Sequence, residues 1–166
     1  MDICRGPLSA ALCRMALAAK GDRAVDIRPY ETSDFDGVSA LWDEAFPNDP
    51  PWNRAEIAIP EKLAFQADLL FVGVEEGRVI GSVMAGYDGH RGWLYSVAVG
   101  QGVRRGGVGT ALVRHAEQAL QALGCAKVNL QVRATNGAVV RFYERLGYAI
   151  EERMSLGKRL QDGALP

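Results

Sequence analysis

Cysteine and histidine are scarce in this chain of 166 residues, which holds three cysteines and two histidines. The cysteines, Cys4, Cys13 and Cys125, are odd in number and lack the spacing of metal ligands, so a Cys/His zinc site is not expected. We expect no metal ion, and a reducing cytoplasm is the simplest setting for an odd number of thiols.

An excess of charge of either sign is also missing, because 19 Lys and Arg residues oppose 20 Asp and Glu residues. Nucleic-acid-binding proteins usually carry a basic excess or stripe, so the balance argues against a nucleic-acid partner. No apolar run reaches the roughly 18 residues of a membrane span, and no membrane partner is expected. The length suits one domain, as either a monomer or a homodimer.

The N-terminal segment LSAALCRMALAAK superficially resembles a signal peptide, but Arg14 interrupts its apolar run. We interpret residues 1–24 as an N-terminal extension, which is either helical or lies upstream of a natural start. The domain is then expected to cover residues 25–160, with residues 161–166 as a tail.

Hydrophobic periodicity predicts an α/β fold in the order βααβββαβαβ. Tight turns at Gly77 and Asp88-Gly89 join consecutive strands, which must therefore be antiparallel. Thr32 or Ser33 is the expected N-cap of the first helix, and Pro60 either opens or kinks the second. The predicted strands cover residues 25–30, 69–76, 78–87, 93–99 and 127–132, with a last strand or two within 148–160. The predicted helices cover residues 35–46, part of 53–66, 108–123 and 137–146.

A glycine-rich loop between the strand 93–99 and the long helix is the most informative segment. Unpaired N–H groups at a helix start attract anions, glycines let an oxygen approach the backbone closely, and arginines add charged donors. The loop therefore predicts a phosphate site, unless its glycines serve only to turn the chain. No Lys-Ser or Lys-Thr follows, as a P-loop requires, and Leu112 stands where a dinucleotide fingerprint needs glycine or alanine. The loop contains Arg104, Arg105, Gly106, Gly107 and Gly109.

Arg104-x-x-Gly107-x-Gly109, following a strand that ends in VAV, resembles the acetyl-CoA loop of the GNAT family of N-acetyltransferases. A second block, NGAVVRFYERLGY at 136–148, is similar to the N-x-x-A/V-x-x-x-Y-x-x-x-G-F/Y signature of that family. The stretches PWN, GYDGHRG and SLGKRL look like those of small bacterial acetyltransferases of the YpeA type. The resemblance covers roughly residues 25–160.

The resemblance implies a mixed, mostly antiparallel sheet flanked by helices, in which the parallel strands 93–99 and 127–133 splay apart to admit the pantetheine arm of acetyl-CoA. It also implies that Tyr143 protonates the departing sulfur, although the helical spacing of Tyr143 with Val139 and Leu146 equally suits a core aromatic. The expected contacts with coenzyme A are Val97, Ala98, Val99, Arg104, Arg105, Gly106, Gly107, Val108, Gly109, Thr110 and Asn136.

The implied activity is transfer of an acetyl group from acetyl-CoA to a primary amine by direct attack on the thioester. Gln131 departs from related enzymes, which carry a glutamate there as general base, and an amide cannot accept a proton near neutral pH. This departure keeps open the alternative of an acetyl-CoA-binding sensor without turnover. A nucleotide-binding protein is a third alternative. Asp88 and His90 either contact the acceptor or shape a turn. Trp42 either lines an acceptor pocket or packs in the core.

Overall fold

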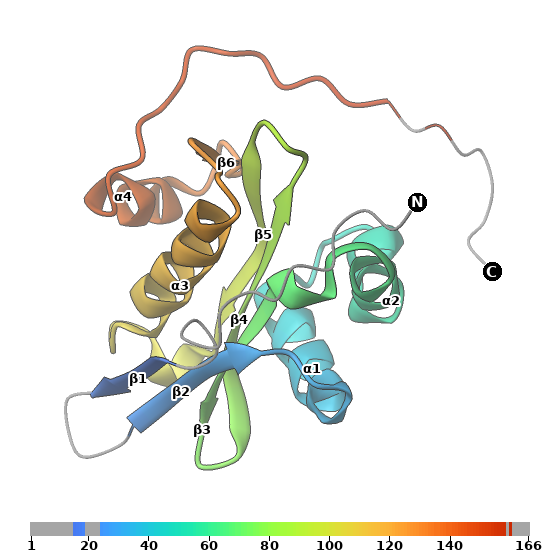
Figure 1. The fold of residues 1–166 in the computed structure, drawn as a ribbon, viewed down its shortest axis with the longest axis vertical. Coiled ribbons are helices and arrows are strands. Elements are labelled where there is room, and N and C mark those ends of the chain that lie inside the picture. Colours follow the sequence, from blue (N-terminus) through green and yellow to red (C-terminus); the bar gives the residue numbers. More distant parts are fainter. Residues whose placement is uncertain (1–14, 19–23, 159, 161–166) are drawn as a thin grey trace. The chain divides into compact units, whose positions relative to one another are not determined.

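The computed structural model describes residues 15–18, 24–158 and 160 (Figure 1). Predictions for residues 1–14, 19–23 and 161–166 lie outside these described residues. Contacts divide the chain into two compact units, Met1–Gln131 and Val132–Pro166, and each is described by itself. None of the described helices is long and apolar enough to cross a membrane.

The first unit is built on a six-stranded sheet in the spatial order β1-β2-β3-β4-β5-β6. Neighbouring strands are antiparallel except for β5 and β6, which run parallel. The mixed, mostly antiparallel sheet and its parallel pair are therefore confirmed. The strands are β1 (Met15–Ala18), β2 (Ala24–Pro29), β3 (Leu70–Glu75), β4 (Arg78–Tyr87), β5 (Gly92–Val99) and β6 (Val128–Leu130).

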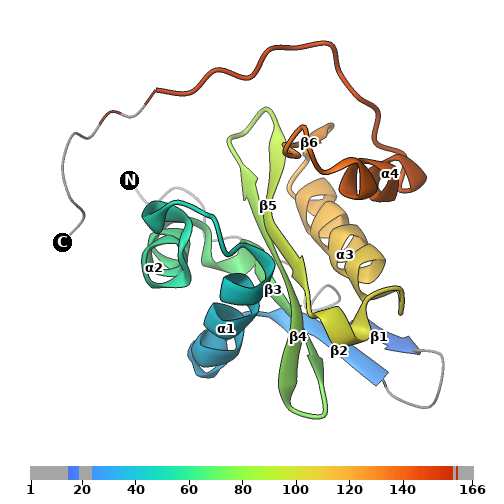
Figure 2. The same ribbon diagram turned by 180° about the vertical axis from the view of Figure 1, so that it is seen from behind.

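Helices cover both faces of this sheet (Figures 1 and 2). Trp42 of α1 (Phe35–Ala45) contacts the Ser82 side chain of β4, whereas a Cβ atom on the adjacent Gly81 would lie 2.7 Å from Leu112 of α3 (Val108–Ala122). Successive residues of a strand face opposite sides, so α1 and α3 lie on opposite faces. Helix α2 (Ala55–Gln66) shares the α1 face.

Each face buries its own apolar layer. A cluster on the α1 side brings together Val38, Leu41, Trp42, Ala55, Ile59, Leu70, Val72 and Ala98. On the other side, α3 buries Val108, Leu112, Ala116, Ala119 and Leu120, which recur at helical spacing, whereas Leu123 after the helix is 41% exposed. Burying one such Val or Leu side chain contributes about 2 kcal/mol, and this packing rather than helix propensity holds α3 in place.

The second unit contains α4 (Gly137–Arg145). Its N-cap is Asn136, whose side-chain oxygen accepts a hydrogen bond of 3.3 Å from the Val139 N–H. Gly147 follows the helix with a φ of +96°, the left-handed conformation that suits glycine after a helix end. Both predicted ends of this helix are confirmed.

The prediction of one or two strands within 148–160 is wrong, because residues 148–158 and 160 form none. Ile150, Met154 and Leu156 are 75% to 93% exposed, so no layer is buried behind this segment. A strand persists only where a neighbour pairs its backbone and an apolar face is covered, and no described strand pairs with these residues.

The N-terminal segment also differs from the prediction. Met15–Ala18 forms β1 and pairs with Ala24–Ile27 rather than adopting a helix, because the neighbouring strand supplies partners for its N–H and C=O groups. At the other end of the sheet, β6 is shorter than predicted and covers Val128–Leu130 alone.

The start of α1 uses a different capping residue from the predicted Thr32 or Ser33. The Asp34 carboxylate accepts a 2.8 Å hydrogen bond from the Glu31 N–H and two from the Arg28 guanidinium, at 2.7 and 2.8 Å. Burial alone raises the pKa of Asp34, but these hydrogen bonds outweigh it and lower that pKa. This pair fixes the end of β2 against the beginning of α1.

Candidate active site

The parallel pair β5–β6 separates along its length. Gly92, Trp93 and Leu94 pair with Val128, Asn129 and Leu130, after which β6 ends while β5 continues to Val99. The β5 edge from Tyr95 to Val99 is therefore left without a neighbouring strand among the described residues. This is the splayed arrangement that the sequence predicted.

The backbone of Val97 and Val99 faces this open edge. The Gly100 N–H donates to the Ile80 carbonyl of β4 at 3.0 Å, and polar groups of successive residues point to opposite sides of a strand. Val97 and Val99 therefore present their N–H and C=O groups away from β4. The Val99 carbonyl is not free, because it accepts a 3.2 Å hydrogen bond from Nε of Arg104.

A β-bulge interrupts β5 in the middle of the open edge. Tyr95 pairs with Met84 and Ala98 pairs with Ser82, so Ser96 and Val97 together face one residue of β4. Ser96 has a φ of +46°, a left-handed conformation that is uncommon outside glycine. Such bulges turn backbone groups out of the regular ladder and are frequent beside active sites.

The loop after β5 ends in an uncapped helix start. Gly107 is the N-cap of α3 with a φ of +87°, no side chain caps the helix, and its first turn holds no acidic residue. The first intrahelical hydrogen bond runs from the Ala111 N–H to the Gly107 carbonyl, at 3.0 Å. The N–H groups of Val108, Gly109 and Thr110 therefore precede the hydrogen-bonded ladder and can bind an anion.

The residues that precede this helix start, Arg104 to Gly107, are exposed. Arg105 has a φ of +67°, and the Gly106 N–H donates to the Val103 carbonyl at 3.3 Å. The side chains of Arg104 and Arg105 are exposed, which leaves their guanidinium groups near the helix start able to contact an anion. The structure thus brings together the predicted residues from Val97 to Thr110.

Asn136 and Tyr143, the remaining predicted residues, belong to the second unit. The Tyr143 ring packs edge-on against Phe142 and Tyr148, with ring centroids 5.0 and 5.4 Å apart. Its side chain is 8% exposed, and burial raises the pKa of Tyr143 to about 12. The hydroxyl therefore keeps its proton well above neutral pH.

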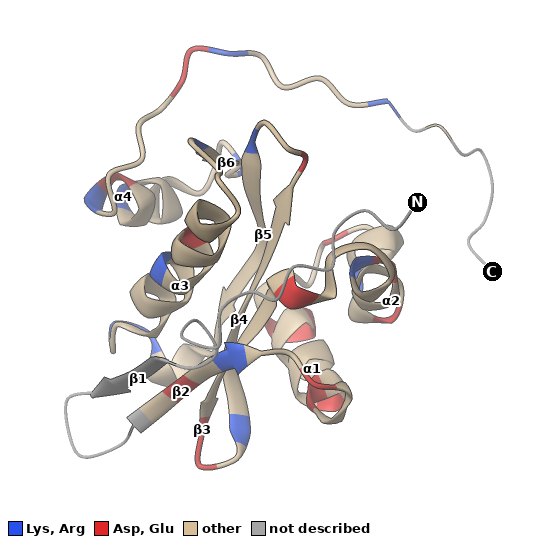
Figure 3. Ribbon diagram, in the orientation of Figure 1, with Lys and Arg blue, Asp and Glu red and all other residues tan. Residues whose placement is uncertain are grey.

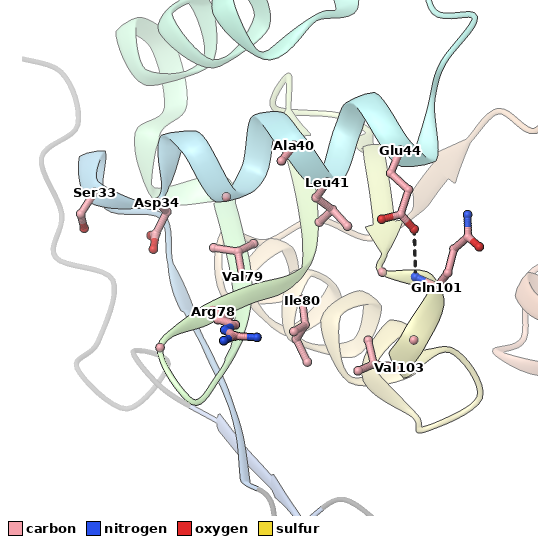
Figure 4. A pocket seen from close by; sticks show the side chains of 14 residues that line it. Ser33, Asp34, Ala40, Leu41, Glu44, Arg78, Val79, Ile80, Gln101 and Val103 are labelled. Atoms are coloured by element: carbon pink, nitrogen blue, oxygen red, sulfur yellow. Dashed lines mark hydrogen bonds between the residues drawn. The ribbon is translucent and has the colours of Figure 1, made fainter.

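A hollow of about 590 Å³ lies on the α1 side of the turn that precedes the loop (Figure 4). Its walls come from α1, the start of β4 and the turn 100–103, and it contains none of the predicted site residues. Across it, Oε1 of Glu44 accepts a 3.1 Å hydrogen bond from the Gln101 N–H. This bond ties α1 to the segment that leads into the anion-binding loop.

The structure decides between interpretations of several polar residues. Oδ1 of Asp88 accepts hydrogen bonds from the N–H groups of His90 and Arg91, at 2.7 and 2.6 Å, which is the geometry of a side chain that shapes a turn. Trp42 is 3% exposed and belongs to the core. Sequence reasoning missed Ser82, a fully buried residue bonded to Trp42, although a single serine within the apolar run of β4 was a visible signal.

Comparison with known proteins identifies the family to which this arrangement belongs. The sequence profile of the acetyltransferase (GNAT) family matches residues 35–148, which include the loop and the Asn136 block. The chain belongs to the GNAT family. The predicted enzyme class, an acyl-CoA-dependent acetyltransferase that uses acetyl-CoA, is thereby confirmed at the level of the family.

Relatives of this GNAT chain include two bacterial proteins of nearly the same length as the matched region. Acetyltransferase YE1169 of Yersinia enterocolitica is 41% identical over 136 residues, which are 82% of this chain and 96% of the relative. Acetyltransferase ECA0875 of Pectobacterium atrosepticum is 42% identical over the same shares.

A solved structure supports the fold of this GNAT chain. The aminoglycoside N-acetyltransferase AAC(6')-Iy, solved in complex with CoA, superimposes with a TM-score of 0.69 at 21% identity. The match covers 87% of this chain and 100% of that one. The predicted α/β fold with a mixed sheet and helices on both faces is confirmed.

Proposed function

We propose that this protein transfers the acetyl group of acetyl-CoA to a primary amine, carried by a small molecule, a protein N-terminus or a lysine, in the cytoplasm. The observation that carries the proposal is the open β5 edge running directly into an uncapped helix start. The open β5 edge suits an extended arm with amide groups, and the uncapped helix start suits a diphosphate. Both chemical groups occur in coenzyme A.

The loop fits the diphosphate. In the proposal the N–H groups from Arg105 to Thr110 hold its oxygens, and Arg104 and Arg105 supply positive charge. The absence of an acidic residue in the first turn of α3 supports this assignment, because a carboxylate there would repel the ligand. Asn136 is proposed to contact coenzyme A as well as cap α4.

The open edge fits the pantetheine arm. Val97 and Val99 present backbone polar groups away from β4, and an extended amide chain can pair with them as an added strand. The Arg104 side chain would release the Val99 carbonyl when the arm binds. Ala98, whose side chain is buried under α1, keeps this part of β5 in place.

The bulge supplies the group that acts on the thioester. We assign this role to the Val97 N–H, which leaves the bulge on the open side of β5. It would donate to the thioester carbonyl and stabilise the negative charge that develops when a neutral amine attacks the carbonyl carbon. The C–N bond forms and the C–S bond breaks. The amine loses one proton and the departing thiolate gains one, so coenzyme A leaves as its thiol.

Tyr143 is the proposed proton donor to the departing sulfur. Since the pKa of Tyr143 is about 12, the hydroxyl is protonated at neutral pH and can donate a hydrogen bond to sulfur throughout the reaction. A thiol has an ordinary pKa of about 8.5, so its thiolate is already a good leaving group and demands little of the Tyr143 hydroxyl.

Charge favours a cationic acceptor. Helix α1 holds Asp36, Asp43 and Glu44 and no Lys or Arg, and α2 adds Glu56 and Glu61 against one cation, Lys62 (Figure 3). The negative potential of these helices would draw an ammonium group toward the α1 side of the sheet. The ammonium must lose a proton before attack, and Gln131 cannot accept it.

A sensor that binds acetyl-CoA without turnover is the second candidate, and Gln131 is the observation that favours it. An assay of free thiol release against a panel of amines, with products identified by mass spectrometry, separates the two. Steady thiol release that depends on an amine, together with an acetylated product, supports the enzyme. Saturable binding of acetyl-CoA with no release for any amine supports the sensor, and tighter binding of ATP or NAD than of CoA contradicts both.

A further inference from the structure

A buried and a partly buried hydrogen bond connect α1 to the bulge of β5. Nε1 of Trp42 donates to Oγ of Ser82 at 2.8 Å, and Oγ of Ser82 donates to the Ser96 carbonyl at 3.3 Å. Trp42 is 3% exposed and Ser82 is fully buried. The three residues lie on α1, β4 and β5, so the chain of bonds crosses from the helix layer into the sheet.

The direction of both bonds is fixed by chemistry. An indole N–H can only donate, so the Ser82 oxygen must accept from Trp42. The single hydroxyl hydrogen then points to the Ser96 carbonyl, which can only accept. Consecutive bonds of this kind polarise one another, so the Ser96 carbonyl receives a stronger hydrogen bond from Ser82 than it would from a hydroxyl that Trp42 did not contact.

The Ser96 carbonyl belongs to the same peptide group as the Val97 N–H. In a trans peptide the C=O and N–H bonds point in opposite directions. Because the carbonyl is held toward Ser82 on β4, the N–H is directed away from β4, toward the open edge of β5. A hydrogen bond to the carbonyl also draws electrons from the nitrogen, which makes the Val97 N–H a stronger donor.

The conformation of Ser96 requires such a restraint. Its φ of +46° lies in a region that is unfavourable for a non-glycine residue, and surrounding contacts must hold it there. Ser82 is the side chain bonded to its carbonyl. Without that bond, the peptide group between Ser96 and Val97 can rotate, and the N–H no longer has a fixed direction.

We propose that Ser82, itself oriented by Trp42, is a positioning residue that aims and polarises the Val97 N–H toward the thioester carbonyl. The inference rests on the proposed function, in which that N–H stabilises the charge developing on the carbonyl oxygen. It adds that the strength of this donor is set by two buried side chains, Ser82 on β4 and Trp42 on α1.

The experiment compares Ser82→Ala and Trp42→Phe with the wild-type protein. Ser82→Ala removes the donor to the bulge, and Trp42→Phe keeps that donor but removes the bond that orients it. Ile27→Val is the matched control for lost stability, because Ile27 is fully buried on β2, which pairs with β1 and β3 and not with β4 or β5. All measurements are made well below the unfolding temperature of each variant.

Three quantities are measured: kcat, the dissociation constant of free CoA, and the infrared carbonyl stretch of bound acetyl-CoA labelled with ¹³C at the acetyl carbonyl. We expect Ser82→Ala to lower kcat about tenfold or more, since loss of one oxyanion donor costs about 100-fold to 1,000-fold. CoA affinity stays unchanged, because CoA has no acetyl carbonyl. The carbonyl stretch, shifted to lower frequency in the wild-type protein, returns toward its value in solution.

Trp42→Phe is expected to change kcat and the carbonyl stretch in the same direction by a smaller factor, and Ile27→Val is expected to change neither. A wild-type carbonyl stretch with no shift, or a shift that survives Ser82→Ala, overturns the role of Ser82 while turnover still supports the proposed function. Absence of acetyl transfer by the wild-type protein overturns the proposed function and this inference with it. If Ser82→Ala does not fold, Trp42→Phe decides by the same two readouts.

Discussion

The side-chain amide of Gln66 exchanges two hydrogen bonds with the backbone of Tyr87: its Nε2 donates to the Tyr87 carbonyl at 2.7 Å, and its Oε1 accepts from the Tyr87 N–H at 3.1 Å. Strand β3 begins at Leu70, which pairs with Met84, so β4 extends beyond its neighbour. Gln66 completes the hydrogen bonds of that uncovered edge as another strand would. Nζ of Lys62, one turn earlier in α2, donates to the Ala85 carbonyl on the same edge.

Replacing Gln66 with Ala leaves two backbone groups of Tyr87 without their partners. We expect the free energy of unfolding to fall by about 1 kcal/mol, measured by urea denaturation. Gln118→Ala on the exposed side of α3 is the matched control and should change stability far less. Equal effects of the two substitutions would show that Gln66 does not hold α2 against β4.

Lys62 predicts a rise of stability with pH. Burial lowers the pKa of the Lys62 ammonium from 10.5 to about 8. Between pH 8 and 10.5 the unfolded chain therefore binds a proton that the folded chain does not, and stability increases across this window by as much as about 3 kcal/mol.

Lys62→Met removes this titration. The free energy of unfolding of the wild type should therefore rise relative to that of the variant between pH 8 and 10.5. Urea denaturation at both ends of the window measures it. Lys158→Met, at an exposed position, should produce no such shift. A pH-independent difference for Lys62→Met contradicts the burial of a charged ammonium.

His115 also predicts that stability rises with pH, in a lower pH window than Lys62. It is 1% exposed, neither ring nitrogen has a hydrogen-bond partner among the described residues, and burial lowers its pKa below the ordinary 6.5. As the pH falls below 6.5, His115 binds a proton in the unfolded chain but stays neutral in the folded chain. The free energy of unfolding therefore keeps its full value above pH 6.5 and decreases below it.

His115→Leu should therefore be at least as stable as the wild type at pH 7, and its advantage should grow as the pH falls toward 5. The comparison is made by thermal unfolding, with His90→Leu at the exposed turn as control. An advantage that does not change with pH would mean that His115 is protonated in the folded protein.

Tyr143→Phe tests the second unit. If the hydroxyl donates to the departing sulfur, kcat should fall about tenfold or more while the dissociation constant of acetyl-CoA is unchanged, as steady-state kinetics and calorimetry measure. The phenylalanine ring can preserve the edge-on contacts with Phe142 and Tyr148, so folding is not the cause. Unchanged turnover with bound acetyl-CoA would make Tyr143 a core aromatic.

Much of the fold could be predicted because local signals agree with long-range packing. The apolar face of α3 begins at the glycines of the loop and ends before Gly124, which has a φ of +84°. The hydrophobic periodicity and the flanking glycines therefore indicate the same helix. The hairpin of β3 and β4 has turn residues between two apolar runs. In such segments the local sequence shows where the helix or strand begins and ends.

Other features depend on partners that are distant in the sequence. Pro60 lies within α2 and does not open it, because the residues before it also join the helix that packs on α1. His115 faces Phe71 at a distance of 4.7 Å between ring centroids, a contact that no spacing on α3 reveals. The same holds for Ser82 and Gln66, whose partners are 14 and 21 residues away.

The anion-binding loop can be tested through its own helix start. Aspartate in the first turn of a helix stabilises the helix by about 0.3–1 kcal/mol through the helix dipole, but repels a diphosphate at the same place. Thr110→Asp should therefore raise or preserve stability while it weakens acetyl-CoA binding, and the neutral Thr110→Asn should leave binding close to that of the wild type.

Isothermal titration calorimetry with acetyl-CoA on folded wild-type protein and on these two variants is the most direct measurement. We expect saturable heat with one site per chain for the wild type and Thr110→Asn, and a much weaker isotherm for Thr110→Asp. No heat for the wild-type protein at millimolar acetyl-CoA, or equal affinity in Thr110→Asp, would contradict the claim that the backbone amides from Arg105 to Thr110 hold the diphosphate.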